Sequence, residues 1–155
     1  AATSAGFIRV NVHVGTMATD QGVIEGNAAE TLRARKALGA ERVAIFADLM
    51  VKHATPIVAV DPSTAAGELR ERGLADAILL TGDVTGSPAD PVLVRRVRDA
   101  TDAPVVVASG VSEENALTLA ELADGFIVGT SIKENGVSDA PIDLQRAQHL
   151  VSLLK

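Results

Sequence analysis

The stretch that most constrains the fold is residues 104–133, PVVVASGVSEENALTLAELADGFIVGTSIK, which contains a complete strand, helix and strand. Its runs 105–108 and 126–128 are apolar throughout, as is typical of parallel strands that are buried on both faces. Between them, Ser112 is expected to cap a helix that reaches about Ala123, since its hydroxyl can accept from first-turn amides. A unit of this kind predicts two parallel strands joined by a right-handed crossover.

Both strands of this unit end in glycine beside hydroxyl side chains. Ser109 and Gly110 follow the first strand, and Gly129, Thr130 and Ser131 follow the second. Glycine lets the backbone approach a ligand closely, while amides and hydroxyls donate hydrogen bonds to an oxyanion. Adjacent strand ends of this kind hold a phosphate in many (β/α)8 barrels. These five residues are therefore the predicted phosphate-binding site, and the alternative is that the two glycines only form tight turns.

The same alternation of strand and helix continues through the whole chain. Further strands are expected at 7–12, 42–47 and 77–80, and further helices at 27–38, 61–73, 91–100 and 143–154. This alternation predicts an α/β fold with a parallel sheet. We expect the five units to be the C-terminal five-eighths of a TIM (β/α)8 barrel, because no dinucleotide-binding glycine fingerprint follows any strand. An open doubly wound sheet is the alternative.

The chain is expected to form one partial-barrel domain over residues 1–155. Residues 1–6 resemble the end of a helix, which is an unusual way for a domain to begin. We therefore expect the N-terminal strands of the barrel to be missing from this chain.

A second group of chemically capable residues follows the strand at 42–47. Asp48, Lys52 and His53 supply a carboxylate, an amine and an imidazole at the carboxyl end of a parallel strand. These are the groups needed for proton transfer or for Schiff-base chemistry, so they are the predicted catalytic residues. The alternative is that Asp48 caps a turn while the other two side chains are solvated.

Two other strands carry polar residues that could contact a ligand. Alternation along the first strand places Arg9 and Asn11 on one face, pointing into the barrel or, as the alternative, into water at a sheet edge. Thr81 and Gly82 end the third strand and either bind a ligand oxygen or form a turn. The segment 13–26 is long for a connection, and such loops are usually functional or mobile.

Composition excludes several classes of function. Hydrophobic residues make up 47% of the chain, which is enough for a sizeable core. The net charge of -6 and the scattered Lys and Arg residues argue against a nucleic-acid partner. The chain has no cysteine and no apolar run of membrane-span length, so we expect a cytoplasmic protein with no membrane span, no metal and no cofactor.

Five runs of sequence resemble the BtpA/SgcQ family, which includes a photosystem I biogenesis protein of cyanobacteria. They are FIRVNVHVGTMATDQGVIEG, FADLMVKHA, GLADAILLTGDVTGSPAD, ASGVSEENA and DGFIVGTSIKENG. The resemblance implies a barrel related to ribulose-phosphate-binding barrels, with about three N-terminal strands absent here. It also implies phosphate binding at Ser109, Gly110, Gly129, Thr130 and Ser131, but it supplies no catalytic mechanism.

Two functions are therefore expected. The first is an enzyme on a phosphorylated small molecule, such as a sugar phosphate or a nucleotide precursor. It is aldolase-like if Lys52 forms a Schiff base and isomerase-like if His53 or Asp48 is a base. The alternative is a non-catalytic assembly factor for a membrane complex, as in photosystem I biogenesis. In either case a homo-oligomer or a missing N-terminal segment is expected to cover the open sheet edges at 7–12 and 126–128.

Overall fold

The computed structural model describes residues 4–51, 54–82 and 89–154. Five strands form a parallel sheet, and they are the five strands that the sequence predicts. In sheet order they are β1 (Phe7–Val10), β4 (Ala44–Asp48), β6 (Ala77–Leu80), β7 (Val105–Val107) and β8 (Gly125–Phe126). Because the strands are parallel, their carboxyl ends lie on one edge of the sheet, and because the sheet order follows the sequence order, consecutive strands are neighbours there.

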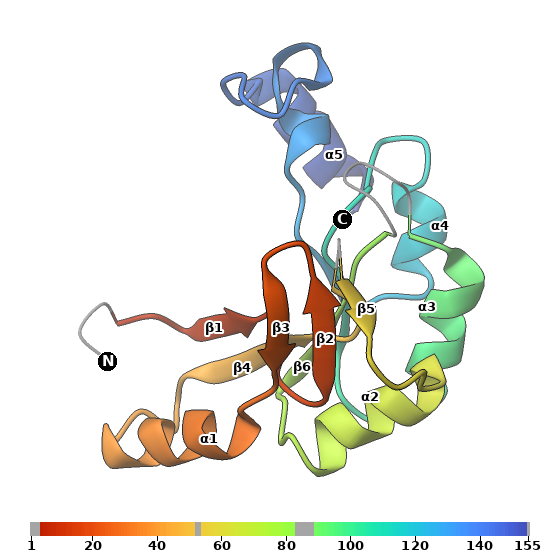
Figure 1. The fold of residues 1–155 in the computed structure, drawn as a ribbon. Coiled ribbons are helices and arrows are strands. Elements are labelled where there is room, and N and C mark those ends of the chain that lie inside the picture. Colours follow the sequence, from red (N-terminus) through yellow and green to blue (C-terminus); the bar gives the residue numbers. More distant parts are fainter. Residues whose placement is uncertain (1–3, 52–53, 83–88, 155) are drawn as a thin grey trace.

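The helices also form where the sequence predicts them, with one difference in length. They are α1 (Ala28–Ala37), α2 (Pro62–Glu71), α3 (Pro91–Arg98), α4 (Ala116–Ala120) and α5 (Leu144–Leu153). Figure 1 shows α2, α3 and α4 following one another along one side of the molecule, and α2 and α3 pack on each other and on β6 and β7. The expected helix at 112–123 is the exception, because only its central part is helical.

Aspartate caps fix the start of three helices. The carboxylates of Asp61, Asp90 and Asp143 accept from backbone amides in the first turns of α2, α3 and α5. Pro62 and Pro91 occupy the first turns of α2 and α3, where an amide proton would have no intrahelical partner. These local signals explain why the starts of α2, α3 and α5 could be predicted.

A second, antiparallel sheet replaces the long loop expected at 13–26. It consists of β2 (Thr16–Thr19), β3 (Gly22–Glu25) and β5 (Ala54–Pro56), in the order β3-β2-β5. Figure 1 shows β2 and β3 as a hairpin with β5 beside β2. Thr19 closes the turn, because its hydroxyl donates to the Gly22 carbonyl and accepts from the Gln21 amide. The expectation of a loop was therefore wrong for this segment.

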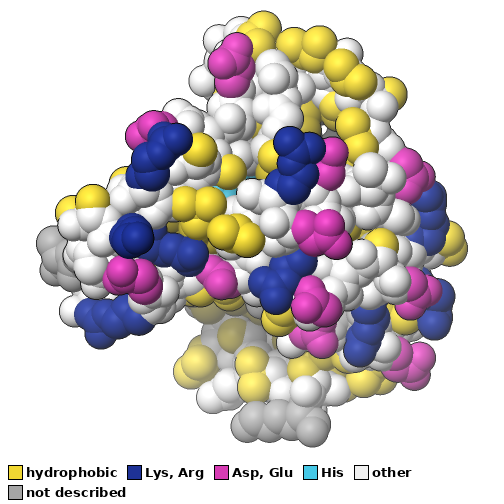
Figure 2. Space-filling model, turned by 90° about the horizontal axis from the view of Figure 1, so that it is seen from below, with side chains coloured by type: hydrophobic (Ala, Val, Ile, Leu, Met, Phe, Trp, Pro, Cys, Tyr) yellow, Lys and Arg dark blue, Asp and Glu magenta, His cyan; other side chains and the backbone are white. Residues whose placement is uncertain are grey.

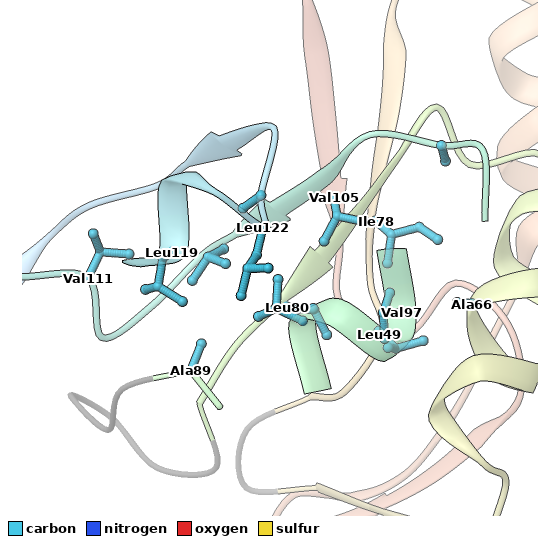
Figure 3. Close-up of a cluster of buried hydrophobic side chains, with 14 of the residues drawn as sticks. Leu49, Ala66, Ile78, Leu80, Ala89, Val97, Val105, Val111, Leu119 and Leu122 are labelled. Atoms are coloured by element: carbon cyan, nitrogen blue, oxygen red, sulfur yellow. The ribbon is translucent and has the colours of Figure 1, made fainter. Parts of the chain in front are cut away.

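The core lies between the parallel sheet and the helices that follow it. All described residues of β6 and β7 are buried, and their side chains meet those of α3 and α4 (Figure 3). The larger buried side chains are aliphatic, as the low aromatic content predicts, and include Ile78, Leu80, Val97, Val105 and Leu119. This packing fixes the positions of β6 and β7, and with them Thr81 and Ala108, which come directly after these strands.

The first strand lies at an open edge of the sheet. Among the described strands, β1 pairs only with β4, and Phe7 and Ile8 are 48% and 39% exposed. The Phe7 ring stacks on Phe46 with ring centroids 4.5 Å apart. This edge offers both unpaired backbone groups and apolar side chains.

The surface carries both signs of charge. Figure 2 shows Lys and Arg side chains interspersed with Asp and Glu on the face seen from below. In the described part of the chain, no helix is long and apolar enough to cross a membrane.

Candidate functional site

The carboxyl ends of four strands form one continuous rim. Hydrogen bonds join each strand end to the next: Thr81 Oγ1 donates to the Met50 carbonyl (2.9 Å), the Ala108 amide to Leu80 (2.7 Å), and the Ile127 amide to Val107 (2.9 Å). The segments after β7 and β8 are joined directly, because Ser131 Oγ donates to the Val111 carbonyl at 2.6 Å. The predicted phosphate-binding residues therefore lie on two neighbouring loops.

The loop after β7 is organised by Asn115, whose importance the sequence analysis missed. Its side-chain amide donates to the Gly110 carbonyl at 2.7 Å, and its side-chain oxygen accepts from the Ser112 amide at 2.8 Å. Gly110 has φ 68°, a conformation that favours glycine. The clue was an asparagine five residues after a glycine at a strand end, a spacing suited to closing a turn.

Asn115 also explains why the predicted cap at Ser112 is wrong. The helix α4 begins one residue after Asn115, and residues 113–115 form a turn. The Ser112 hydroxyl donates to the Glu114 carboxylate instead of accepting from first-turn amides. This contact helps to hold the pKa of Glu114 below its usual value, because the hydrogen bond favours the charged form.

In the loop after β8, the groups available to a ligand are backbone amides, because the hydroxyls of Thr130 and Ser131 already have partners. The Ser131 hydroxyl proton goes to Val111, and Thr130 Oγ1 lies 3.3 Å from Ser138 Oγ. Within the described ranges, the amides of Gly129, Thr130 and Ser131 have no hydrogen-bond acceptor. Gly129 is exposed, and a Cβ atom added to it would meet no atom within 4 Å. An anion could thus reach these amides from solvent.

Asp48 ends β4 on the same rim and forms an ion pair with Arg9 of β1. Arg9 Nε lies 3.1 Å from Asp48 Oδ1, and Arg9 Nη2 lies 3.1 Å from Oδ2. The Asp48 side chain is 3% exposed and that of Arg9 is 37% exposed. Two residues that were predicted separately, one as catalytic and one as ligand-binding, are therefore brought together.

In the part of the chain that the structure describes, the other predicted site residues do not join this ion pair. Thr81 and Gly82 are buried, and the Thr81 hydroxyl holds the strand ends together through Met50. Asn11 is exposed in the bend after β1. Lys52 and His53 lie outside the described residues.

A cavity of about 460 Å³ opens beside Asp48. It lies between the start of β2, the end of β4, the segment after β5 and one side of α2. It could not be predicted from the sequence, because two of its walls, at the start of β2 and after β5, come together only through the unpredicted antiparallel sheet. Its described lining is mostly aliphatic and thioether side chains, including Met17, Met50, Ile57, Ala65 and Leu69.

His13 is a buried polar residue that was not among the predicted site residues. Its side chain is 1% exposed, and Nε2 donates to the Gly73 carbonyl at 2.8 Å. A carbonyl can only accept, so this bond places the proton on Nε2. Nδ1 is buried with no partner among the described residues. The contact ties the segment after β1 to the end of α2, which forms one side of the cavity.

These features define a class of protein. A parallel sheet of five strands, with helices packed on it and polar or glycine-rich loops on one carboxyl edge, is a TIM-barrel-like α/β fold. A solved structure with this fold, the YdjI aldolase from Escherichia coli K12, aligns with a TM-score of 0.53. The alignment covers 97% of this chain and 56% of that chain at 20% sequence identity, which shows likeness of fold alone.

Comparison of the sequence with known proteins identifies the particular family. The model of the BtpA family matches residues 1–155, and this chain belongs to that family. It is 45% identical over 151 residues to the photosystem I biogenesis protein BtpA of Synechocystis, covering 97% of this chain and 52% of that protein. It is also 45% identical over 154 residues to an uncharacterized protein of Thermococcus kodakarensis, covering 99% of this chain and 58% of that protein. The chain thus spans somewhat more than half the length of these curated relatives.

Proposed function

We propose that this chain binds a phosphorylated small molecule, with the phosphate on the loops after β7 and β8. The observation that carries the proposal is the junction of those loops by the 2.6 Å bond from Ser131 to Val111, beside amides of residues 129–131 that have no acceptor within the described ranges. Such amides stabilise a phosphate by hydrogen bonding at little steric cost. Ser109 and Gly110 complete the proposed site from the other loop.

The proposed chemistry takes place at the end of β4. Neighbouring strands lie about 5 Å apart, so the end of β4 is about 10 Å from that of β7, with β6 between them. Asp48 or His53 would act as the base of an isomerisation, or Lys52 would form the Schiff base of an aldolase-like reaction on a substrate such as a sugar phosphate. In this scheme Arg9 is a positioning residue for Asp48.

Substitution of Gly129 tests the phosphate site. A valine side chain at this position would project into open space, so Gly129→Val should leave folding nearly unchanged but cover the amides. We expect binding of inorganic phosphate and of phosphorylated sugars, measured by isothermal titration calorimetry, to fall at least tenfold. Gly125→Ala is the matched control, because its new Cβ would make only an ordinary contact of 3.6 Å with Val106. Unchanged binding in Gly129→Val would overturn the placement.

Chemical trapping tests the proposed reaction. Incubation with a panel of phosphorylated aldehydes and ketones, followed by borohydride, should reduce a Schiff base to a stable secondary amine on Lys52. Mass spectrometry of the intact protein and its peptides would locate the adduct, with Lys52→Arg as the control. If no member of the panel gives an adduct while phosphate binding persists, the aldolase-like reaction is excluded and base catalysis by Asp48 or His53 remains.

A non-catalytic assembly factor is the second candidate, and a specific surface favours it. The relative in Synechocystis is named for photosystem I biogenesis, and β1 here exposes Phe7 and Ile8 at an open sheet edge. Such an edge can pair with a partner chain. Binding of a partner protein that is lost on substitution in β1 but not in Gly129→Val would favour this function.

The same edge suggests how the fold is completed. The five parallel strands would form five-eighths of a (β/α)8 barrel, with the remaining strands supplied by a longer form of the chain or by another copy. In this arrangement the phosphate site and Asp48 share one mouth of a closed, cytoplasmic barrel.

A further inference from the structure

The cavity beside Asp48 is a feature of the rim that the proposed phosphate site does not use. Its volume of about 460 Å³ is within the range of small-molecule sites, roughly 300–1,000 Å³. Residues of β2 and β5 form one wall of it, and residues of α2 form another. The cavity therefore exists only because the segment 13–26 folds as a hairpin and pairs with β5.

The lining of the cavity does not suit a sugar. A sugar needs several donors and acceptors placed around its hydroxyls, since a buried polar group without a partner is costly. Among the described lining residues, the polar side chains are those of Thr16, Asp48 and Glu68. The other lining side chains are aliphatic, proline or methionine, which suit a hydrocarbon body.

The charges at the cavity also limit what can enter it. Asp48 and Glu68 are both acidic, and no Lys or Arg belongs to the described lining. Asp48 is paired with Arg9, while the nearest nitrogen of Arg72 lies 3.9 Å from Glu68. Among the described lining residues a second anionic group would find no cation to bind, whereas an uncharged hydrocarbon needs none.

The cavity is connected to the proposed phosphate site along the rim. Met50 lines the cavity, and its carbonyl accepts from Thr81 at 2.9 Å. The next strand end follows directly, because the Ala108 amide donates to the Leu80 carbonyl at 2.7 Å and Ser109 comes next in the sequence. With strands spaced about 5 Å apart, a ligand that reaches from the phosphate loops to the cavity is about 10–15 Å long.

We infer that the cavity holds an apolar body of the phosphorylated ligand, so that the substrate class is an amphipathic phosphate monoester with a hydrocarbon portion. This inference rests on the proposed phosphate site for one end of the ligand and on the cavity for the other. It narrows the phosphorylated small molecule of the proposed function to one with an apolar group, in place of the sugar phosphate given there as an example. It also gives the antiparallel sheet a role, as the wall that selects that group.

Alkyl phosphates test the inference on the whole chain. We would titrate inorganic phosphate, hexyl phosphate, 1-hexanol and hexanoate by calorimetry, with two-dimensional NMR to locate shifts. Burial of the hexyl chain should make hexyl phosphate bind about 10–100-fold more tightly than inorganic phosphate. Hexanol should bind weakly in the cavity, and hexanoate more weakly still because of the acidic walls.

Variants locate the binding of the hydrocarbon. Ala65→Phe should fill the cavity from α2 and remove the advantage of hexyl phosphate over inorganic phosphate, while leaving phosphate affinity unchanged. Ile57→Glu is a second variant, which should fold because Ile57 is 57% exposed. Its carboxylate should weaken binding of the hexyl group in the cavity. Thr64→Phe is the matched control, since Thr64 is exposed on the same helix and is not part of the described lining.

The outcomes separate this inference from the proposed function. If inorganic phosphate binds but hexyl phosphate binds no more tightly, the inference fails and the phosphate site stands. If hexanol binds and Ala65→Phe abolishes it while no phosphate binds, the cavity is a ligand site but both the proposed function and the amphipathic substrate fail. If hexyl phosphate gains affinity that Ala65→Phe and Ile57→Glu do not reduce, the hydrocarbon lies elsewhere and the inference is overturned.

Discussion

At the residue scale, the pair formed by Arg9 and Asp48 is the contact with the largest expected cost of disruption on the rim. The side chain of Asp48 is 3% exposed, whereas that of Arg9 is 37% exposed and has access to water. Loss of the guanidinium would weaken the compensation of a buried carboxylate. Loss of the carboxylate would leave an arginine that can turn toward solvent. The two single substitutions should therefore differ in cost.

We predict that Arg9→Gln lowers the free energy of unfolding by about 2 kcal/mol and Asp48→Asn by about 1 kcal/mol. Urea denaturation followed by circular dichroism measures both. Arg33→Gln is the control, because Arg33 pairs with Glu30 on exposed α1 and should change stability by less than about 0.5 kcal/mol. A cost for Asp48→Asn equal to or above that for Arg9→Gln would contradict this account.

The pH dependence of stability should come partly from two exposed aspartates. The amide of Ser63 and the guanidinium of Arg96 lower the pKa of Asp61 below its usual value, and Arg70 lowers the pKa of Asp102 likewise. A carboxyl whose pKa is lower in the folded state stabilises that state above the unfolded pKa, and this contribution is lost as pH falls through the folded pKa.

We therefore predict that stability falls as the pH drops below about 4 and that Asp61→Asn with Asp102→Asn makes the fall shallower. Thermal unfolding midpoints at a series of pH values in this acidic range give the measurement. Both side chains are exposed, so salt should weaken the effect. An equally steep fall in the double variant would show that other carboxylates dominate.

The residue scale is also where the sequence was least sufficient. Asp48 could be predicted at the end of its strand from local pattern alone. Its partner could not be predicted, because Arg9 lies 39 residues earlier and the pairing depends on β1 lying beside β4. The organising role of Asn115 similarly depends on how the loop after β7 folds back onto Gly110.

At the scale of elements, local signals determined how well each segment could be predicted. Buried strands such as β6 and β7 are continuous apolar runs, and the helices with Asp-Pro starts carry their own caps. The hairpin β2–β3 has no apolar run, and three of its four residues in β2 are Thr or Ala. It is joined by β5, whose residues lie at least 35 positions from their partners in β2 and add a third strand.

Two glycines give predictions of opposite sign for these elements. A Cβ atom at Gly26, which follows β3, would lie 2.7 Å from backbone atoms of Val14, so the backbone must shift. Gly67 lies inside α2, and a Cβ there would meet no atom within 4 Å. We expect Gly26→Ala to destabilise by about 1–3 kcal/mol and Gly67→Ala to stabilise by about 0.5–1 kcal/mol.

Urea denaturation of the two variants measures these changes. Hydrogen exchange adds a test of location, because Gly26→Ala should reduce protection in the hairpin while leaving β6 and β7 protected. If Gly26→Ala leaves the free energy of unfolding and the hydrogen-exchange protection of the hairpin unchanged, the close approach of Gly26 to Val14 does not stabilise the base of the hairpin.

At the scale of the whole molecule, the order of the strands in the sheet could be predicted from the sequence. What covers the outermost strand, β1, could not. Successive parallel strands with helical crossovers lie side by side, which gives the observed order. The same order leaves β1 outermost, with Phe7 and Ile8 exposed. A flat apolar edge is a template for pairing with another chain.

This edge leads to a prediction about assembly. If β1 of one copy pairs with another copy, a charge on the strand should oppose it, because a lysine would have to be desolvated in the interface. We expect the unchanged chain to self-associate as its concentration rises and Ile8→Lys to shift the equilibrium toward monomer at least tenfold. Sedimentation equilibrium over a hundredfold range of concentration measures both. Val92→Lys is the control, since Val92 is 66% exposed on α3, away from the edge. Because Gly129 and the phosphate loops follow β7 and β8, phosphate binding should persist in Ile8→Lys; equal association of all three proteins would show that copies meet elsewhere.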